Sequence, residues 1–211
     1  GARKVYIEEE PKVAAIGVGM DISKPTANMV LDIGGGTTDI AVLSLNGIVS
    51  SSSVKVAGNS LNQDIIKYIR EKYKLLIGEP TAEDIKINFA NVYKPSKKEK
   101  MEVKGRNLLT GLPGTIEINQ EEIKEALKDG VNRIVKATKS VLEQTPPELA
   151  GDIVEKGVIL TGGGSQLTGL VEVMEEELTI PALIAESPLT CVAEGCGILL
   201  NNIKQLEEDQ E

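Results

Sequence analysis

The stretch Asp32-Ile33-Gly34-Gly35-Gly36-Thr37-Thr38-Asp39 joins two apolar segments, 29–33 and 39–45, that are predicted to be β-strands. Three consecutive glycines let the backbone approach an anion without interference from Cβ atoms, and successive N–H groups in such a turn form an anion-binding nest. Asp32 at the rim is suited to hold Mg²⁺, usually through water, and the threonine hydroxyls to contact a phosphate or an attacking water. A plain glycine-rich hairpin is the alternative interpretation, because such turns are common.

A second stretch, Val158 to Ser165 (VILTGGGS), has the same order of a buried strand and three glycines, and a helix is predicted after it. A flat group such as a nucleoside can lie against this glycine backbone. The stretch is not G-x-G-x-x-G and lacks the lysine of a P-loop, so neither a Rossmann nor a Walker site is supported. Two such turns in one chain predict two walls of one nucleotide cleft.

Two charged motifs are candidates for the same cleft. Glu83 and Lys86 are three residues apart on a predicted helix, so they share a face and could grip ribose hydroxyls or adenine. A weak surface ion pair is the alternative. Glu10 ends an acidic run before Pro11, at a helix start where the dipole favours a carboxylate. That carboxylate could orient a water towards a phosphate, or the run could be an ordinary acidic helix start.

Outward from the first turn, Asn46-Gly47 predicts a tight hairpin to a third strand at 48–56. The strand 39–45 is almost continuously apolar and is therefore expected to be buried on both faces. A helical region opens at Gly58, and a further helix is predicted from Thr81, with Asp84 three residues later completing a capping box. The lysine-rich segment 94–106 is expected to be a solvated turn or hairpin.

The remaining elements follow from periodicity and caps. Asn119 is predicted to cap a long helix that ends at Pro146-Pro147. The Gln205–Glu211 tail is acidic and expected to fray. Strands are predicted at 4–7, 115–119, 157–161 and 182–184, and helices at 10–19, 167–178 and 188–202.

Composition excludes several classes of function. The 211 residues carry 23 basic and 32 acidic side chains, a net charge of −9, which argues against a nucleic-acid partner. Histidine is absent, which excludes Ser-His and Cys-His nucleophile pairs and histidine-ligated metal sites. Cys191 and Cys196 lie in an apolar stretch and are expected to be reduced, buried packing residues. No apolar run reaches the roughly 18 residues of a spanning helix and the start shows no signal pattern, so a cytoplasmic setting is expected.

Several strings together resemble the MreB/Mbl family of bacterial actin-like cell-shape proteins, within the actin, sugar kinase and heat-shock-chaperone ATPase superfamily. They are RKVYIEEEPKVAAIG, MVLDIGGGTTDIAVLSLNGIV, VAGNSLNQDIIKYIREKYKLLIGEPTAEDIKI, VILTGGGSQLTGL and CVAEGCGILL. The resemblance implies an α/β, ribonuclease H-like (actin-like ATPase) subdomain IIA with an inserted, mostly helical α+β subdomain IIB. The implied boundaries are 1–20 for the end of domain I and a hinge helix, 21–56 and 157–204 for IIA, 57–156 for IIB, and 205–211 for the acidic tail. The segments 11–19 and 188–202 are implied to be the helices that cross between the two halves.

The resemblance also implies ATP and Mg²⁺ as cofactors and assigns roles to residues. Asp32 would face the metal, Glu10 would position the hydrolytic water, and Thr37 would assist it. Glu8, Lys12 and Val13 depart from the family's usual stretch here, but Glu10 still precedes proline. The implied nucleotide-binding residues are Asp32, Gly34, Gly35, Gly36, Thr37, Glu83, Asp84, Ile85, Lys86, Gly162, Gly163, Gly164 and Ser165.

The implied function is that of an ATP-binding filament former that determines cell shape by organising cell-wall synthesis. Its implied partners are further copies of itself, cell-wall synthesis proteins and membrane-anchored shape proteins, at the inner face of the membrane. The family's first phosphate loop, a DxGT-like turn, is absent from this sequence. The chain is therefore expected to be a second half with little ATPase activity of its own, with membrane contact made only by the missing half.

Two alternatives stay open from the sequence. One is half of a chaperone-type ATPase that does not polymerise, and the other is an interaction module that has lost nucleotide binding. Residues 1–9 are expected to lack native neighbours, being either disordered or paired with another copy of the chain.

Overall fold

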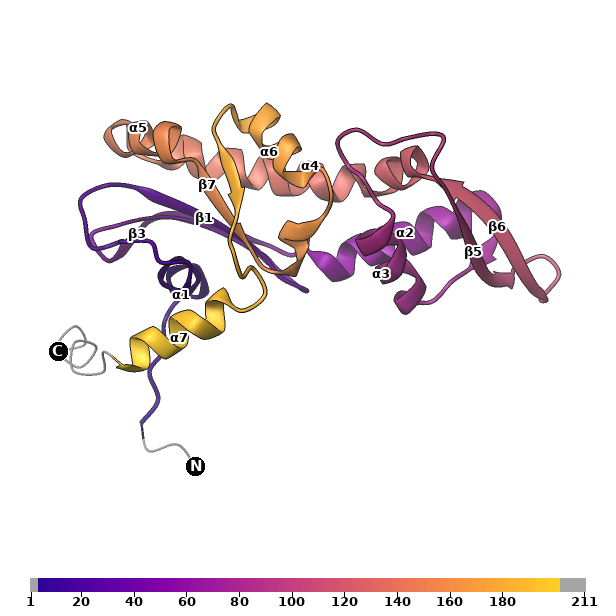
Figure 1. Cartoon of the computed structure of the whole chain (residues 1–211), viewed down its shortest axis with the longest axis horizontal. Coiled ribbons are helices and arrows are strands. Elements are labelled where there is room, and N and C mark those ends of the chain that lie inside the picture. Colours follow the sequence, from indigo (N-terminus) through magenta and orange to yellow (C-terminus); the bar gives the residue numbers. More distant parts are fainter. Residues whose placement is uncertain (1–3, 202–211) are drawn as a thin grey trace.

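The computed structural model describes residues 4–201 of the 211, as an elongated molecule with two sheets placed along its length (Figure 1). The larger sheet has five strands in the order β3 (Gly47–Val54), β2 (Thr38–Ser44), β1 (Asn28–Ile33), β7 (Val158–Thr161) and β8 (Ala182–Ile184). β2 is antiparallel to both of its neighbours, β1 and β3, whereas β7 runs parallel to β1 and β8 runs parallel to β7. The predicted strands 29–33, 39–45, 48–56, 157–161 and 182–184 are all present, with ends shifted by at most two residues.

Both faces of the larger sheet are covered. Ile40 and Val42 of β2 belong to the core on the side of the long helix α4 (Gln120–Gln144), which packs on β2 and β3. Ala41 and Leu43 alternate with them and belong to the core beneath α1 (Glu10–Gly17), which packs against α7 (Cys191–Asn201). This double burial confirms the expectation for the continuously apolar strand.

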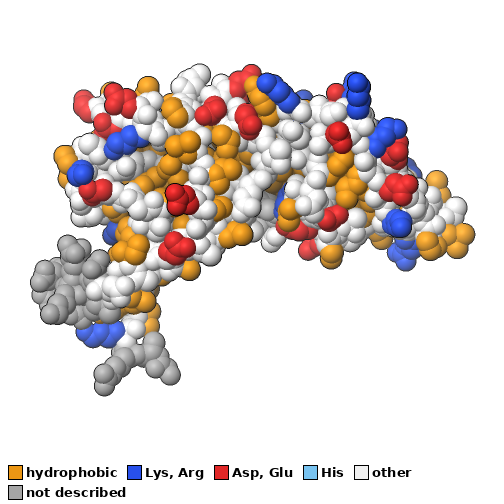
Figure 2. Space-filling model, in the orientation of Figure 1, with side chains coloured by type: hydrophobic (Ala, Val, Ile, Leu, Met, Phe, Trp, Pro, Cys, Tyr) orange, Lys and Arg blue, Asp and Glu red, His pale blue; other side chains and the backbone are white. Residues whose placement is uncertain are grey.

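The smaller sheet lies at the other end of the molecule (Figure 1). It is antiparallel, in the order β4 (Leu75–Leu76), β5 (Lys100–Asn107) and β6 (Pro113–Asn119), and lies with α2 (Gly58–Tyr73) and α3 (Glu79–Asn88). The lysine-rich segment thus runs into the β5–β6 hairpin. At its turn Leu109 and Leu112 are 80% and 65% exposed, and Figure 2 shows hydrophobic side chains at that end of the molecule.

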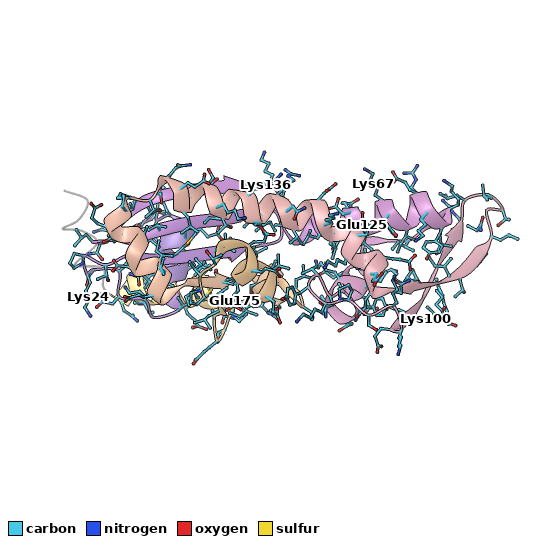
Figure 3. The ribbon with its side chains drawn as sticks, turned by 90° about the horizontal axis from the view of Figure 1, so that it is seen from above. Lys24, Lys67, Lys100, Glu125, Lys136 and Glu175 are labelled. Atoms are coloured by element: carbon cyan, nitrogen blue, oxygen red, sulfur yellow. The ribbon has the colours of Figure 1, made fainter. Side chains whose placement is uncertain are left out.

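Helix α4 connects the two ends of the molecule. Figure 3 shows Glu125 and Lys136 along this helix, with Lys24 and Lys100 at opposite ends of the molecule. As predicted, Asn119 caps it: the Asn119 side chain accepts from the Glu122 N–H at 3.2 Å, and the Glu122 carboxylate accepts from the Asn119 N–H at 2.8 Å. Because α4 packs on β2, β3, α2 and β6, it belongs to both ends, and the division at residues 57 and 156 stays a prediction. The remaining elements are α5 (Pro147–Lys156), the 3₁₀ helix η1 (Gly163–Gln166) and α6 (Leu170–Leu178).

Several local predictions were wrong. Residues 4–7 form no strand, and Val5 and Ile7 are 76% and 85% exposed, because nothing within the described residues buries both faces of this segment. Residues 1–3, which precede this segment, lie outside the described residues. The hairpin turn is one residue earlier than expected: Leu45 and Asn46 have φ of 51° and 63°, and Gly47 already pairs with Ser44.

The third helix starts at Glu79 with Gly78 as its N-cap, so Thr81 is inside the helix and forms no capping box. Pro80 suits the first turn of a helix, where its missing N–H costs no hydrogen bond, so the Gly78-Glu79-Pro80 break is the start of α3.

Cys191 is buried as expected, but Cys196 is exposed, because it lies on the outward side of α7. The final helix begins at Cys191 rather than at residue 188, and β4 and α5 were not predicted. The acidic tail lies outside the described residues.

Within residues 4–201, no helix combines the length and the apolar character needed to cross a bilayer.

Candidate functional site

The first glycine turn is held in a fixed shape by the start of α2. Inside the turn, the Gly34 N–H donates to the Thr37 carbonyl at 3.0 Å. The first two N–H groups of α2, those of Gly58 and Asn59, donate to the carbonyls of Gly34 and Gly35 at 3.0 and 2.8 Å. These donors would otherwise be unpaired at a helix start, so the turn and α2 satisfy each other.

The second glycine turn lies directly beside the first. β7 pairs with β1 in parallel, with Thr161 opposite Asp32, so the two strands end at the same edge of the sheet (Figure 1). Gly162 then has φ 77° and ψ 164°, a conformation open to glycine alone. A Cβ atom at Gly162 would lie 2.3 Å from the Ile33 carbonyl oxygen and 2.4 Å from the Asp32 Oδ1.

The two turns face one cavity of about 440 Å³. Six of the predicted residues line it, and seven further residues complete the wall. The predicted residues are Gly34, Gly35, Glu83, Lys86, Gly163 and Gly164, and the others are Gly58, Asn59, Leu61, Ile87, Gln166, Leu167 and Leu189. The prediction that the two turns and the Glu83/Lys86 pair converge on one groove is therefore confirmed.

Glu83 and Lys86 form the wall contributed by α3. Lys86 is only 8% exposed, and its Nζ donates to the Gly58 carbonyl at 3.1 Å while pairing with a Glu83 carboxylate oxygen at 3.2 Å. The other Glu83 oxygen accepts from the Asn62 side chain at 2.5 Å. The hydrogen bond from Asn62 and then Lys86 lower the pKa of Glu83, so this carboxylate is ionised at neutral pH. Lys86 is thus buried whereas the Glu83 side chain is 45% exposed, and the pair belongs to a hydrogen-bonded network rather than being the isolated surface ion pair of the alternative interpretation.

Asp32 lies behind the turns, at the end of β1. It is 5% exposed, and burial, followed by the negative charges of Glu10 and Asp39, raises its pKa to about 6. The buried Thr161 hydroxyl, which has no hydrogen bond of good geometry within residues 4–201, lies beside this carboxyl and partly offsets the rise. The negative charge of Glu10 acts on Asp32 because the packing of α1 against β1 places the start of the helix near the strand end.

The remaining predicted residues do not line the cavity. Gly36 and Glu10 are exposed and Thr37 is half-buried, all on the β1–β2 side. Ile85 is fully buried in the core, whereas Asp84 is exposed and accepts from the Asn88 side chain at 2.8 Å. Ser165 is fully buried and donates to the Gly162 carbonyl at 2.7 Å. Ile85 and Ser165 therefore contact other residues of the chain instead of facing the cavity.

The residues that sequence reasoning missed come from helix starts and turns. Gly58 and Asn59 reach the cavity because α2 begins there, and the predicted start of this helix was the signal that could have found them. Gln166 and Leu167 follow the second turn directly, whereas Leu189 lies far along the chain and gave no local signal.

A larger cavity, of about 720 Å³, lies between α4, α6 and residues 92–95. Its walls carry side chains of both signs, among them Lys94, Lys128, Glu121 and Glu176, and none of the predicted site residues. It contains no strand end and no glycine backbone, so the smaller cavity at the sheet edge is the better candidate.

Comparisons with known proteins agree with this geometry. The family model described as MreB/Mbl protein matches residues 1–208. The chain belongs to the MreB/Mbl family. It is 55% identical to the cell shape-determining protein Mbl of Bacillus subtilis (strain 168) over 206 residues, which are 98% of this chain and 62% of that protein. It is 50% identical to the cell shape-determining protein MreB of Escherichia coli (strain K12), over 96% of this chain and 58% of that protein.

Solved structures of related proteins confirm the expected actin-like fold. MreB 5 of Spiroplasma citri bound to AMPPNP superposes with a TM-score of 0.93 at 41% identity, over 100% of this chain and 63% of that one. The MamK double helical filament matches with a TM-score of 0.74 at 22% identity, over 92% of this chain and 58% of that one, a likeness of fold alone. This MreB/Mbl chain therefore spans less than two thirds of the length of the relatives that it matches.

Proposed function

We propose that this chain is the part of an MreB-like protein that binds the base, ribose and outer phosphates of ATP. The observation that carries the proposal is the single cavity walled by both glycine turns and by the Glu83/Lys86 pair. Glycine backbone on two sides suits phosphates and a flat base, and an ionised carboxylate suits ribose hydroxyls. The related MreB 5 is bound to AMPPNP in one structure and to ADP in another, which supports a nucleotide as ligand.

The glycines of the first turn give independent support. A Cβ atom at Gly36 would have no neighbour within 4 Å among the described residues, and at Gly35 it would meet only the Asn59 side chain at 3.7 Å. Neither residue has a positive φ. Because the fold itself does not require glycine at these positions, their bare, exposed backbone is best explained by close approach of a ligand.

Mg²⁺ fits this site through one protein carboxylate. Within residues 4–201 no group of three or more acidic or cysteine side chains is placed to hold a metal ion. Asp32 would therefore hold Mg²⁺ with water and phosphate oxygens as the other ligands, which is the usual arrangement for this ion. The metal would neutralise phosphate charge, and Glu10 with Thr37 would orient the attacking water.

At the level of the whole protein, we propose an ATP-binding filament former that determines cell shape by organising cell-wall synthesis. Relatives at 50% and 55% identity are named cell shape-determining proteins, which supports this role. Further copies of the protein, cell-wall synthesis proteins and membrane-anchored shape proteins are its proposed partners, at the inner face of the membrane. Sedimentation of the full-length protein with and without ATP tests polymerisation, and a protein that stays monomeric would contradict it.

The test of nucleotide binding compares two glycine-to-alanine changes. We expect the chain to bind ATP in the presence of Mg²⁺, and Gly35→Ala to weaken binding about tenfold, because Gly35 lines the cavity and the new methyl occupies ligand space. Gly151→Ala is the matched control, since a Cβ atom has room at both positions and Gly151, in α5, does not line the cavity. Calorimetric titration measures both affinities. No ATP affinity in the unaltered chain, or equal affinity in the two variants, would contradict the proposal.

A further inference from the structure

Asn62 is a buried amide for which the core has no evident use. It lies in α2 and is 4% exposed. Its Nδ2 donates to one Glu83 carboxylate oxygen at 2.5 Å, while its Oδ1 is buried and has no hydrogen-bond partner among residues 4–201. Burial of a half-satisfied amide destabilises a fold, so its one hydrogen bond requires an explanation.

That hydrogen bond fixes the side chain that faces the cavity. Lys86 holds the second Glu83 oxygen at 3.2 Å, and the same Nζ donates to the Gly58 carbonyl at 3.1 Å. The Gly58 N–H in turn donates to the Gly34 carbonyl of the first glycine turn at 3.0 Å. A continuous series of contacts therefore runs from Asn62 through Glu83 and Lys86 to the turn.

The hydrogen bond from Asn62 is also the largest influence that keeps the pKa of Glu83 below its ordinary value. Lys86, on the same helix, is the charged group that faces Glu83. The glycine turns and Gln166 on the other walls of the cavity carry no charge. A fixed, ionised carboxylate whose oxygens each keep a free lone pair is suited to accept a hydrogen bond from a hydroxyl group of a ligand.

We propose that Asn62 is a positioning residue for ribose recognition: it orients the Glu83 carboxylate so that Glu83 accepts a hydrogen bond from a ribose hydroxyl of the bound nucleotide. The inference rests on the proposed nucleotide binding. It adds a residue that does not line the cavity itself, and it assigns the discrimination between ribonucleotides and deoxyribonucleotides to this network.

The chain offers a matched control on the same two helices. The neighbouring Gln63 donates to Glu79 at 2.7 Å, so this pair also links α2 to α3 through an amide and a carboxylate. The pair is exposed, and neither residue lines the cavity. If the Asn62 bond only held the helices together, loss of either amide would have similar effects on nucleotide binding.

The experiment measures dissociation constants for ATP, 2′-deoxy-ATP and 3′-deoxy-ATP, with Mg²⁺, in the unaltered chain and in Asn62→Ala and Gln63→Ala. We expect the unaltered chain to prefer ATP over at least one deoxy form. Asn62→Ala should weaken ATP binding about fivefold, the value of one hydrogen bond, and leave that deoxy form almost unchanged. Gln63→Ala should leave all three constants unchanged.

Asn62→Asp keeps the shape of the side chain and serves if Asn62→Ala does not fold, which circular dichroism would show. It places a second carboxylate beside Glu83, and the two repel each other unless they share a proton. Relative to the unaltered chain at the same pH, ATP affinity of this variant should therefore rise between pH 8 and pH 6. In Asn62→Ala the pKa of Glu83 returns upward, so its ATP affinity relative to that of the unaltered chain should fall towards pH 5.

Equal losses for ATP and both deoxy forms, or no loss in Asn62→Ala, would overturn the inference while leaving nucleotide binding intact. No binding of any nucleotide by the unaltered chain would instead contradict the proposed function. An Asn62→Asp variant whose affinity has the same pH dependence as the unaltered chain would also count against the positioning role.

Discussion

The two glycine turns have the same three letters and different physical reasons for them. At Gly162 and Gly164 the fold itself requires glycine: a Cβ atom at Gly162 would overlap the Ile33 carbonyl at 2.3 Å, and one at Gly164 would overlap the Ile33 side chain at 2.3 Å. At Gly36 a Cβ atom would have open space, and the residue has no positive φ that would favour glycine. The second turn packs closely against the end of β1, whereas the first exposes its backbone to solvent.

The difference shows that a glycine-rich motif can report either on the fold or on a ligand. The second turn must be glycine-rich for β1 and β7 to end side by side, whether or not a nucleotide is bound. Gly35 and Gly36 of the first turn have no such need within the described residues, so they carry more information about binding. Changes at the two turns should therefore separate stability from affinity.

The largest effect is expected for Gly162→Ala. Its φ of 77° and ψ of 164° and its contact with the end of β1 leave no room for a methyl group. We expect a loss of about 3 kcal/mol, or roughly 6–12 °C in melting temperature for a chain of this size. Thermal unfolding by circular dichroism measures it. Gly151→Ala, in an open position of α5, should instead be neutral or slightly stabilising, and equal melting temperatures for the two variants would remove the distinction between the turns.

A smaller effect of opposite sign is expected for Asp32→Asn, where the two turns meet. The pKa of Asp32 is raised from 3.8 to about 6, so the folded state binds a proton more tightly than the unfolded state. Its contribution is favourable below pH 4 and is lost as pH rises through 6, because the buried carboxylate must then ionise. Asp32→Asn should therefore stabilise the chain at pH 7.5 by about 1–3 kcal/mol relative to its effect at pH 4.

Denaturant unfolding of both proteins at the two pH values measures this difference. The same variant should bind Mg²⁺-ATP more weakly, if Asp32 holds the metal. A variant that is destabilised equally at both pH values would show that Asp32 is not a strained, ionised group in the free chain.

The smallest effect is expected for Ser165→Ala. The Ser165 hydroxyl is fully buried and donates to the Gly162 carbonyl, so its loss should cost about 1 kcal/mol. Because Ser165 does not line the cavity, ATP affinity should change by less than about twofold. Exposed Ser53 on the edge strand is the control, and Ser53→Ala should change neither quantity. A clear loss of ATP affinity with no loss of stability would instead indicate that Ser165 contacts the nucleotide.

Much of the site could be predicted from local pattern. Each glycine turn follows a strand that is recognisable from its apolar run, and Glu83 and Lys86 share a helical face by spacing alone. The errors concern which of several adjacent residues forms a turn or starts a helix. Leu45 adopts the left-handed conformation predicted for Gly47, and Pro80 lies in the first turn of a helix that it was expected to precede. Cys196 was placed in the core because an apolar string does not say which side of a helix faces outward.

The sequence by itself determined the five strands of the larger sheet, the two turns and the charged pair, because each depends on periodicity or on the conformational freedom of neighbouring residues. The tertiary structure alone decided that Gly162 rests on Ile33, that Asn62 bonds to Glu83 and that Leu189 reaches the cavity. These contacts join residues 21 or more positions apart, and they exist only because β7 pairs with β1 and α2 packs on α3. No local pattern encodes such a pairing, since it depends on how whole elements bury their apolar faces together.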